Sequence, residues 1–266
     1  MLEIFQYSFM QNALFAALLA SIACGLIGTF IVVRKLVFIT GGIAHISFGG
    51  IGLGYFLGIN PLLTAIPFGV LSSIFIGVLS KKTKISEDSA VGVLWALGMA
   101  LGILLIYLTP GYAPGLFTYL FGNILAVPLH ELQLMAGLDA IICLSVFGLF
   151  KELRAVSFDE EFSEAAGLPT NRIYLFLLAL ISLSIILLIK SVGIILVLAM
   201  LTIPALISKN HTKNLKAMMG ISILIGVFFS LLGLGISYLF NLPSGAVIIL
   251  LLGGAFFLSA AFKKML

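Results

Sequence analysis

Apolar runs of 17 to 25 residues recur along the whole chain, and no other feature constrains its fold so strongly. Each run is long enough to cross a hydrocarbon core of about 30 Å as a helix that rises about 1.5 Å per residue. Hydrophobic residues make up 62% of the 266 residues and charged residues only 9%, compared with about 25% charged residues in soluble domains. The chain is therefore predicted to be an all-α polytopic protein of the cell membrane (the inner or cytoplasmic membrane), in contact with the lipid bilayer.

Nine of these runs are predicted to span the membrane. They are Phe9–Val33, Val37–Ile59, Pro61–Ser80, Ser89–Leu108, Leu132–Phe150, Arg172–Ile189, Val192–Ser208, Lys216–Phe240 and Gly245–Phe262. Only Lys190, Ser191 and Gly193 interrupt the apolar sequence between the sixth and seventh runs, so eight spans with one re-entrant segment are an alternative. The whole chain, residues 1–266, is expected to form a single transmembrane domain.

The basic residues test this count, because cytoplasmic loops of membrane proteins collect lysine and arginine. With nine spans and an external N-terminus, thirteen of the 14 basic residues fall on one side, which becomes the cytoplasmic side and includes the C-terminus. These residues are Arg34, Lys35, Lys81, Lys82, Lys84, Lys151, Arg154, Arg172, Lys209, Lys213, Lys216, Lys263 and Lys264. Membrane orientation accounts for the net charge of +4, so no nucleic-acid partner is expected.

A predicted cytoplasmic loop carries an acidic segment at about residues 157–170, "SFDEEFSEAAGLPT". Ser157 is expected to cap a short helix, Asp159–Gly167, which Gly167 and Pro169 would end. The helix would present acidic and small side chains: Glu160, Glu161, Glu164, Ala165, Ala166 and Gly167. One interpretation is a solvated acidic surface, and the other is a helix that docks in a groove of a partner protein.

The sequence contains neither an ATP-binding motif nor the charged residues of an ion-driven carrier. No glycine is followed by lysine, so the phosphate-binding loop G-x-x-x-x-G-K-[ST] is absent. Asp139 is the only carboxylate well inside a predicted span, whereas ion-driven carriers use several intramembrane charges. The chain is therefore not expected to be an enzyme, and a transport function would need a separate ATPase.

The second predicted span combines a deep histidine with two sets of glycines. One helical face carries Gly42, His45, Gly49 and Gly52, and the G-x-x-x-G ridge beside it carries Gly50, Gly54 and Gly58. Such small residues let helices pack closely in a membrane. His45 lies about 12 Å from the start of the span at helical rise. An ionisable group at this depth is a candidate for function, and a hydrogen-bonded packing residue is the alternative.

Five segments, taken in order, resemble the membrane permease subunits of bacterial and archaeal ABC importers for zinc, manganese and iron. They are Arg34–Lys35 with the following Gly-Gly-x-Ala-His-x-Ser-x-Gly-Gly stretch, Thr118–Val127, Ser157–Pro169, Val192–Ser208 and Leu242–Leu251. The resemblance implies a homodimer of permeases, two cytoplasmic ATPase subunits that use ATP, and an external binding protein that delivers the metal. The divalent metal ion would be the substrate, with no cofactor bound permanently.

The resemblance also implies roles for particular residues. His45 would be a transient metal ligand in the ion path, and the segment containing Glu164 and Gly167 would couple the permease to the ATPase. Many members of the family carry aspartate at the positions of Gly41 and Asn123. Because imidazole suits zinc and oxygen ligands suit manganese, these differences favour zinc slightly, with manganese and iron as alternatives. Further candidates for the ion path or its entrance are Asp139, Asn123, His130 and Glu131.

Two other classes of protein compete with this interpretation. An ABC permease for a metal chelate, such as a siderophore or a corrinoid, usually has a longer chain with about ten spans. An intramembrane protease would need a set of catalytic groups that one deep histidine does not supply. The close approach of glycines in the second span predicts that this span lies near the dimer axis or against a helix that does.

Overall fold

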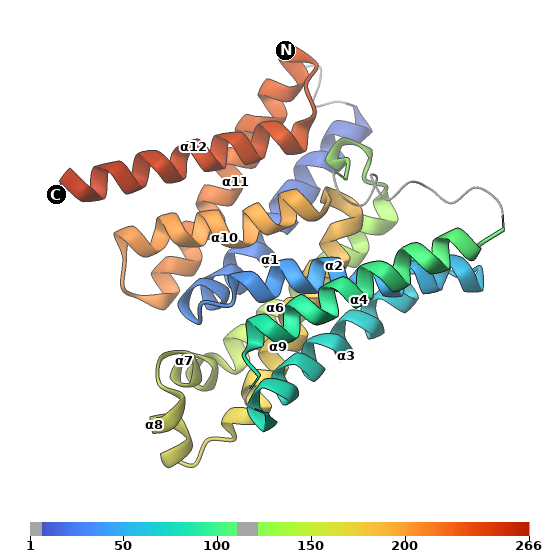
Figure 1. Cartoon of the computed structure of the whole chain (residues 1–266). Helices are drawn as coiled ribbons and strands as arrows, with labels where there is room; N and C mark the ends of the chain where they lie inside the picture. The colour runs from blue at the N-terminus through green and yellow to red at the C-terminus, as the bar shows by residue number, and fades with distance from the viewer. Residues whose placement is uncertain (1–6, 84, 111–121, 266) are drawn as a thin grey trace. The chain divides into compact units, whose positions relative to one another are not determined.

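The protein is described by a computed structural model that covers residues 7–83, 85–110 and 122–265, and no strand occurs in these ranges. Within them, nine helices are long and apolar enough to cross a membrane (Figure 1). They are α1 (Ser8–Val33), α2 (Val37–Leu57), α3 (Pro61–Lys82), α4 (Glu87–Leu108), α6 (Leu129–Gly148), α9 (Thr170–Val192), α10 (Ile194–His211), α11 (Leu215–Phe240) and α12 (Ser244–Met265). The predicted all-α architecture with nine spans is confirmed for this part of the chain.

The break between α9 and α10 bears on the choice between nine and eight spans. Gly193 has a φ of 85° and a ψ of 155°, a conformation that L side chains rarely adopt. The residue ends one helix and begins the next, and each of the two helices is long enough to cross the membrane alone. The apolar sequence between residues 172 and 208 is therefore divided into two separate helices of span length, as the prediction of nine spans requires.

The chain divides into two compact units. The first comprises Met1–Val32, Leu116–Gly148 and Leu188–Leu266, and the second comprises Val33–Gly115 and Leu149–Leu187. In the first unit, α10, α11 and α12 pack on one another, and α1 approaches α10 and α11 closely. A methyl group on Gly28 would overlap the carbonyl oxygen of Leu201, so only glycine fits at that contact.

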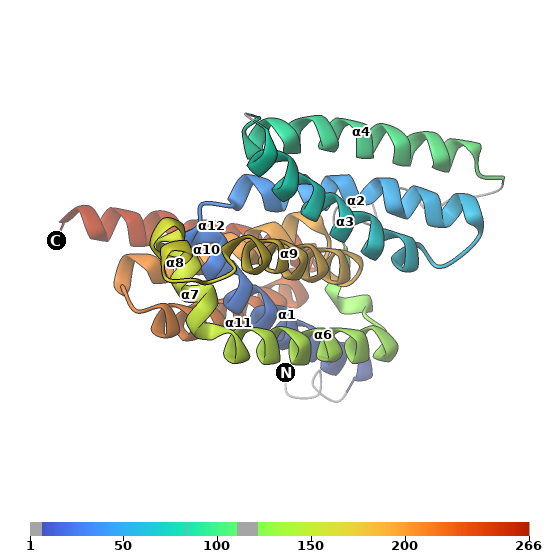
Figure 2. The same ribbon diagram turned by 90° about the horizontal axis from the view of Figure 1, so that it is seen from below.

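In the second unit, α2 lies between α3 and α4 (Figure 2). Both neighbouring helices have defined starts. The Asn60 side chain accepts a hydrogen bond from the backbone N–H of Leu62, and Pro61 is the first residue of α3. Ser86 accepts from the N–H of Ser89 and caps α4. Helix α9 packs on α3 at glycines, since a methyl group on Gly77 would approach Leu178 of α9 to 2.7 Å.

One predicted member of a glycine ridge has a different role. Gly58 was expected to extend the ridge of Gly50 and Gly54, but it follows the last residue of α2 and has a φ of 67°. Its backbone N–H bonds to the carbonyl oxygens of Gly54 and Tyr55, and apart from its own chain neighbours no described residue comes within 4 Å of the place a Cβ would occupy. Gly58 is a helix cap in the left-handed conformation and is not a packing residue.

The acidic segment folds differently from the sequence prediction. An unpredicted amphipathic helix, α7 (Phe150–Phe158), includes Ser157, so the prediction that Ser157 caps the acidic helix is wrong. Asp159 is the cap instead, because its Oδ1 accepts from the N–H of Phe162 at 2.8 Å. The acidic helix α8 (Glu160–Ala165) has six residues. Gly167, with a φ of 85°, ends this region as predicted.

Candidate functional site

His45 lies in the second unit, where the second and fourth spans meet. Its ring stacks on Trp95 of α4, with 4.3 Å between ring centroids and 7° between ring planes. Its Nδ1 is buried and has no hydrogen-bond partner in the part of the chain that the structure describes. A buried ring nitrogen without a partner is costly, so a ligand, a water molecule or another chain would be stabilising there.

The predicted glycine face around His45 packs on α4. A methyl group on Gly42 would overlap the side chain of Val91, and one on Gly52 would lie 2.6 Å from the carbonyl oxygen of Gly102. A methyl group on Gly49 would meet both the ring of Phe68 in α3 and α4 itself. These glycines bring the backbones of α2 and α4 together, which places the imidazole flat on the indole.

The second glycine set faces α3. A methyl group on Gly50 would lie 2.6 Å from the Cα of Ala65, and one on Gly54 would lie 2.5 Å from the Cα of Pro61. Both contacts are with backbone atoms, which cannot rotate away as a side chain can. Helix α2 is therefore packed through glycine on two sides within its own unit.

Asp139 lies in α6 of the first unit, whereas His45 belongs to the second. The carboxyl group is 7% exposed, and its Oδ2 has no hydrogen-bond partner among the described residues. A buried carboxyl oxygen without a partner marks Asp139, like His45, as a group that could receive a proton or an ion. Within the described ranges, no cluster of three or more His, Cys, Asp or Glu residues could hold a metal ion by itself.

The two remaining entrance candidates of α6 differ sharply in environment. His130 is exposed, whereas Glu131 is 8% exposed and forms an ion pair of 2.9 Å with Lys190. The Ser191 hydroxyl donates to the same carboxylate at 3.1 Å. Lys190, the one basic residue outside the predicted cytoplasmic groups, thus has a buried partner. Asn123 is exposed, and its Oδ1 accepts from the N–H of Leu125 to cap the short 3₁₀ helix η2 (Ile124–Ala126).

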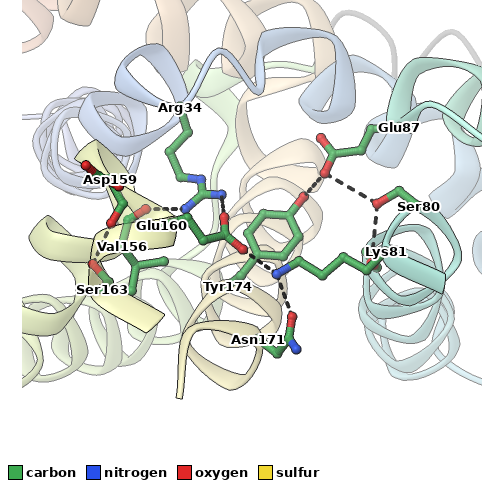
Figure 3. Close-up of polar contacts among 11 residues, drawn as sticks. Arg34, Ser80, Lys81, Glu87, Val156, Asp159, Glu160, Ser163, Asn171 and Tyr174 are labelled. Atoms are coloured by element: carbon green, nitrogen blue, oxygen red, sulfur yellow. Dashed lines mark hydrogen bonds and ion pairs between the residues drawn. The ribbon is translucent and has the colours of Figure 1, made fainter. Parts of the chain in front are cut away.

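A second polar centre surrounds Glu160, the first residue of α8 (Figure 3). Its Oε2 pairs with Arg34 at 2.7 Å, and its Oε1 pairs with Lys81 at 2.5 Å. Partial burial raises the pKa of Glu160, but hydrogen bonds from Lys81 and Arg34 and their charges outweigh that effect, so the pKa lies below its ordinary value. We call Glu160, Arg34 and Lys81 the Glu160 cluster.

The Glu160 cluster also tests the predicted topology. Arg34 lies in the loop before α2, Lys81 in the last turn of α3, and Glu160 in the loop region between α6 and α9. Their direct contacts place these three segments at one end of the second unit. Pairs of spans separate the three segments, so this arrangement agrees with the predicted assignment of all three to the same side of the membrane.

The outer surface of α8 is open. Glu161, Glu164, Ala165, Ala166 and Gly167 are exposed, and Ser163 is the one buried residue of the helix. Two aromatic side chains accompany the acidic ones, because Phe158 is 60% exposed and Phe162 is 70% exposed. An exposed surface that combines aromatic and acidic side chains next to small residues has the chemistry of a docking site.

These features define a polytopic helical membrane protein with one deep histidine and a short acidic helix outside its spans. Residues 6–263 match the ABC 3 transport family, and the chain belongs to this family of metal-transport ABC permeases, as its five motifs predicted.

Individual relatives are similar over nearly the whole chain. A membrane protein of Synechocystis sp. is 47% identical over 99% of this chain and 94% of its own length. The manganese transport system membrane protein MntC of Listeria monocytogenes is 36% identical over 97% of this chain and 91% of its own. The solved structure of PsaBC from Streptococcus pneumoniae in complex with Fab matches with a TM-score of 0.86 and 36% identity, over 97% of this chain and 93% of that one.

Sequence reasoning missed two parts of these sites. In the sequence, Trp95, the one tryptophan of the chain, was identified only as part of an apolar span, although in the structure it stacks on His45. Arg34 and Lys81 were used only to predict which side of the membrane is cytoplasmic, although in the structure both bind Glu160. The rarity of tryptophan was a signal for the first. The contacts of Arg34 and Lys81 with Glu160 could not be predicted, because no sequence pattern indicates contacts between residues so far apart in the chain.

Proposed function

We propose that the chain is the permease subunit of an ATP-driven importer that carries a divalent metal ion across the cell membrane, with manganese as the first candidate. The observation that carries this proposal is near full-length similarity to PsaBC and to a protein named for manganese transport. A homodimer of this chain, two ATPase subunits and an external binding protein would complete the importer. ATP would be hydrolysed by the partner subunits and not by this chain.

The choice of ion rests on two opposed considerations. Relatives from Listeria and Streptococcus carry manganese in their names. The donor at His45 is a lone imidazole, which suits zinc better than manganese. Manganese comes first because the relatives named for manganese match this chain over 97% and 92% of its length, whereas the argument for zinc rests on one side chain. Zinc and iron are the alternatives that a transport assay should compare directly.

In this proposal, His45 contacts the passing ion. The buried Nδ1 without a partner supports such a role. Two copies in a homodimer would offer two imidazoles, enough to replace part of the hydration shell while leaving the ion free to depart. Asp139, Asn123, His130 and Glu131 are proposed to contribute along the path or at its entrance. Glu131 already forms an ion pair with Lys190, so of these four residues it is the least available to bind the metal ion.

The exposed surface of α8 is proposed as the contact with the ATPase, within a cytoplasmic coupling segment of the single permease domain. Exposure of Glu161, Phe162 and Glu164 supports this role. Replacing both Glu161 and Glu164 by lysine should reduce recovery of the ATPase with the purified permease. Replacing both by glutamine keeps the shape and should have a smaller effect. Equal recovery with the lysine variant would favour a solvated surface.

The decisive experiment is ion uptake by proteoliposomes that contain the permease, its ATPase and its binding protein. Wild-type complex should take up manganese when ATP is supplied. His45→Ala should reduce uptake at least about tenfold, the effect of losing a ligand worth roughly 1.4 kcal/mol. His211→Ala, at the last residue of α10, is the matched control and should transport normally. Unchanged uptake by His45→Ala would return His45 to a packing role, and uptake of a chelate alone would favour the chelate class.

A further inference from the structure

Helix α8 cannot be held in place by its own hydrogen bonds. Isolated helices shorter than about 12–15 residues are marginal in water, and α8 has six. Its buried residue, Ser163, donates its hydroxyl only to the carbonyl oxygen of Asp159, which is within the same turn. The side chains of Glu161, Phe162 and Glu164 are exposed. Contacts from outside the helix must therefore fix its position.

The Glu160 carboxylate provides such contacts, one from each oxygen. Oε2 accepts from Arg34, and Oε1 accepts from Lys81. Arg34 also donates to the carbonyl oxygen of Val156 in α7 at 2.7 Å, so one guanidinium holds the end of α7 and the start of α8. Lys81 also donates to Asn171 Oδ1 at 2.6 Å, which adds the start of α9.

The two cations are themselves positioned by an aromatic ring (Figure 3). The Arg34 Cζ lies 4.7 Å and the Lys81 Nζ 5.0 Å from the centroid of the Tyr174 ring. Tyr174 is 1% exposed, and its hydroxyl donates to Glu87 Oε1 in the first turn of α4. The ring therefore forms a fixed support, and the charges need little reorganisation to hold the carboxylate.

We infer that Glu160 is a positioning residue for energy coupling, which fastens α8 to the loop before α2 and to the end of α3. The inference rests on the proposed function, because it assumes that the ATPase moves α8. A short helix tied to two spans by charge-assisted hydrogen bonds transmits a displacement to both, whereas an untied helix would move alone. Glu160 faces the permease and not the ATPase, which separates it from the exposed Glu161 and Glu164.

Glutamine at position 160 tests this inference sharply. Arg34 and Lys81 are donors only, so both oxygens of Glu160 must accept. A glutamine side chain has nearly the same shape but offers one acceptor and one NH₂ group. One of the two cations would therefore face a donor, and that contact would be lost. The matched control is Glu152→Gln in α7, the same chemical change at a residue outside the cluster.

The first measurement is metal uptake per ATP hydrolysed by the complete reconstituted importer. Glu160→Gln should assemble with the ATPase and hydrolyse ATP, but its uptake per ATP should fall about tenfold, the size expected when one charged partner is left unsatisfied. Glu152→Gln should keep the wild-type ratio. Lys81→Met removes the contact with Oε1 of Glu160 and the bond to Asn171 while Arg34 stays paired, so it should also lower uptake per ATP, and it serves as the second variant if Glu160→Gln fails to fold.

The second measurement is the distance distribution between spin labels in the full chain in lipid nanodiscs. Labels are attached through Ala165→Cys in α8 and Lys82→Cys at the end of α3, with Cys24 and Cys143 replaced by alanine. The distribution should be narrow with Glu160 and broad with Glu160→Gln. An unchanged distribution would overturn the inference, and so would a broad distribution with normal coupling. A wild-type complex that hydrolyses ATP but transports no metal would contradict the proposed function, while the distances would still decide the anchoring.

Discussion

Replacing Gly98 by alanine should separate α2 from α4. Gly98 faces the backbone of α2, and a Cβ there would lie 2.8 Å from the Cα of Ile46 and 2.9 Å from its carbonyl oxygen. Ordinary contacts of this kind begin at 3.4 Å, and the obstructing atoms belong to backbone. The two helices must therefore move apart by about half an ångström, which is a strain of the overpacking type.

The magnitude follows from two opposed contributions. Overpacking of a tight contact costs about 1–3 kcal/mol, and a gap of about half an ångström forfeits roughly a quarter of the dispersion energy of neighbouring atoms. Alanine gains about 0.5–1 kcal/mol over glycine in a helix. The matched control is Gly92→Ala in the same helix, where no described residue outside the helix's own nearby backbone lies within 4 Å of the added methyl group. The two variants should differ by about 2 kcal/mol, or roughly thirtyfold in the unfolding equilibrium.

The assay combines global and local measurements. Unfolding by sodium dodecyl sulfate in mixed micelles gives the free energy of unfolding for each variant. The fluorescence of Trp95, the one tryptophan of the chain, reports locally, because His45 lies 4.3 Å from the indole and a wider helix spacing would disturb that stack. Gly98→Ala should lower the free energy of unfolding and change the emission. A Gly98→Ala variant as stable as Gly92→Ala, with unchanged emission, would refute the packing argument.

Other predictions address the polar contacts. Glu131→Gln should lower the free energy of unfolding by about 3 kcal/mol, because Lys190 would keep a charge without a buried partner. Ser191→Ala removes one hydrogen bond to the same carboxylate and should lower it by about 1 kcal/mol. Equal effects of the two substitutions would contradict the ion-pair assignment. Tyr174→Phe should keep the narrow spin-label distribution and Tyr174→Leu should broaden it, since only the ring supports the two cations. The pKa of Glu160 is lowered in the folded chain, so its stabilising contribution is complete above the ordinary carboxyl pKa of about 4.3 and is lost as pH falls through the folded value. The difference in free energy of unfolding between wild type and Glu160→Gln should then be constant from pH 7 to 5 and shrink below about pH 4; no change down to pH 3 would contradict the assignment.

Membrane spans were predictable because hydropathy adds over some 20 residues. A single polar residue such as Lys190 or Ser191 cannot cancel the signal of its neighbours, and only the boundaries shift by a few positions. The break at Gly193 was marked in the sequence only by Lys190, Ser191 and Gly193 itself, which is why two span counts remained open.

Local signals failed where two residues competed for one role. Ser157 and Asp159 are both good caps, and the preceding residues have enough helical amphipathicity to take Ser157 into α7. Gly58 continued a spacing of four, yet the helix had already ended one residue before it. A glycine at a helix end looks the same in the sequence whether it caps the helix or continues a packing ridge. Only the backbone conformation of Gly58 distinguishes the two roles.

Candidate sites were predictable as single residues but not as pairs. The depth of His45 followed from counting along a helix, whereas its stacking on Trp95 depends on how two helices are rotated against each other. The acidic residues of α8 were evident, but their division into the inward Glu160 and the outward Glu161 and Glu164 depends on where Arg34 and Lys81 lie. Those partners are set by tertiary structure, which a periodicity in one segment does not encode.

The contact between Gly52 and Gly102 limits how this protein can evolve. A methyl group on Gly52 would lie 2.6 Å from the Gly102 carbonyl oxygen, and one on Gly102 would overlap the carbonyl oxygen of Phe48 in α2. Neither glycine could be exchanged for alanine without moving two spans. A second substitution on the opposite helix could not restore the space, because the obstructing atoms belong to the backbone, which every residue carries. Lineages that keep the histidine–tryptophan stack should therefore keep both glycines unchanged, even where the lipid-facing surfaces of the same helices diverge freely.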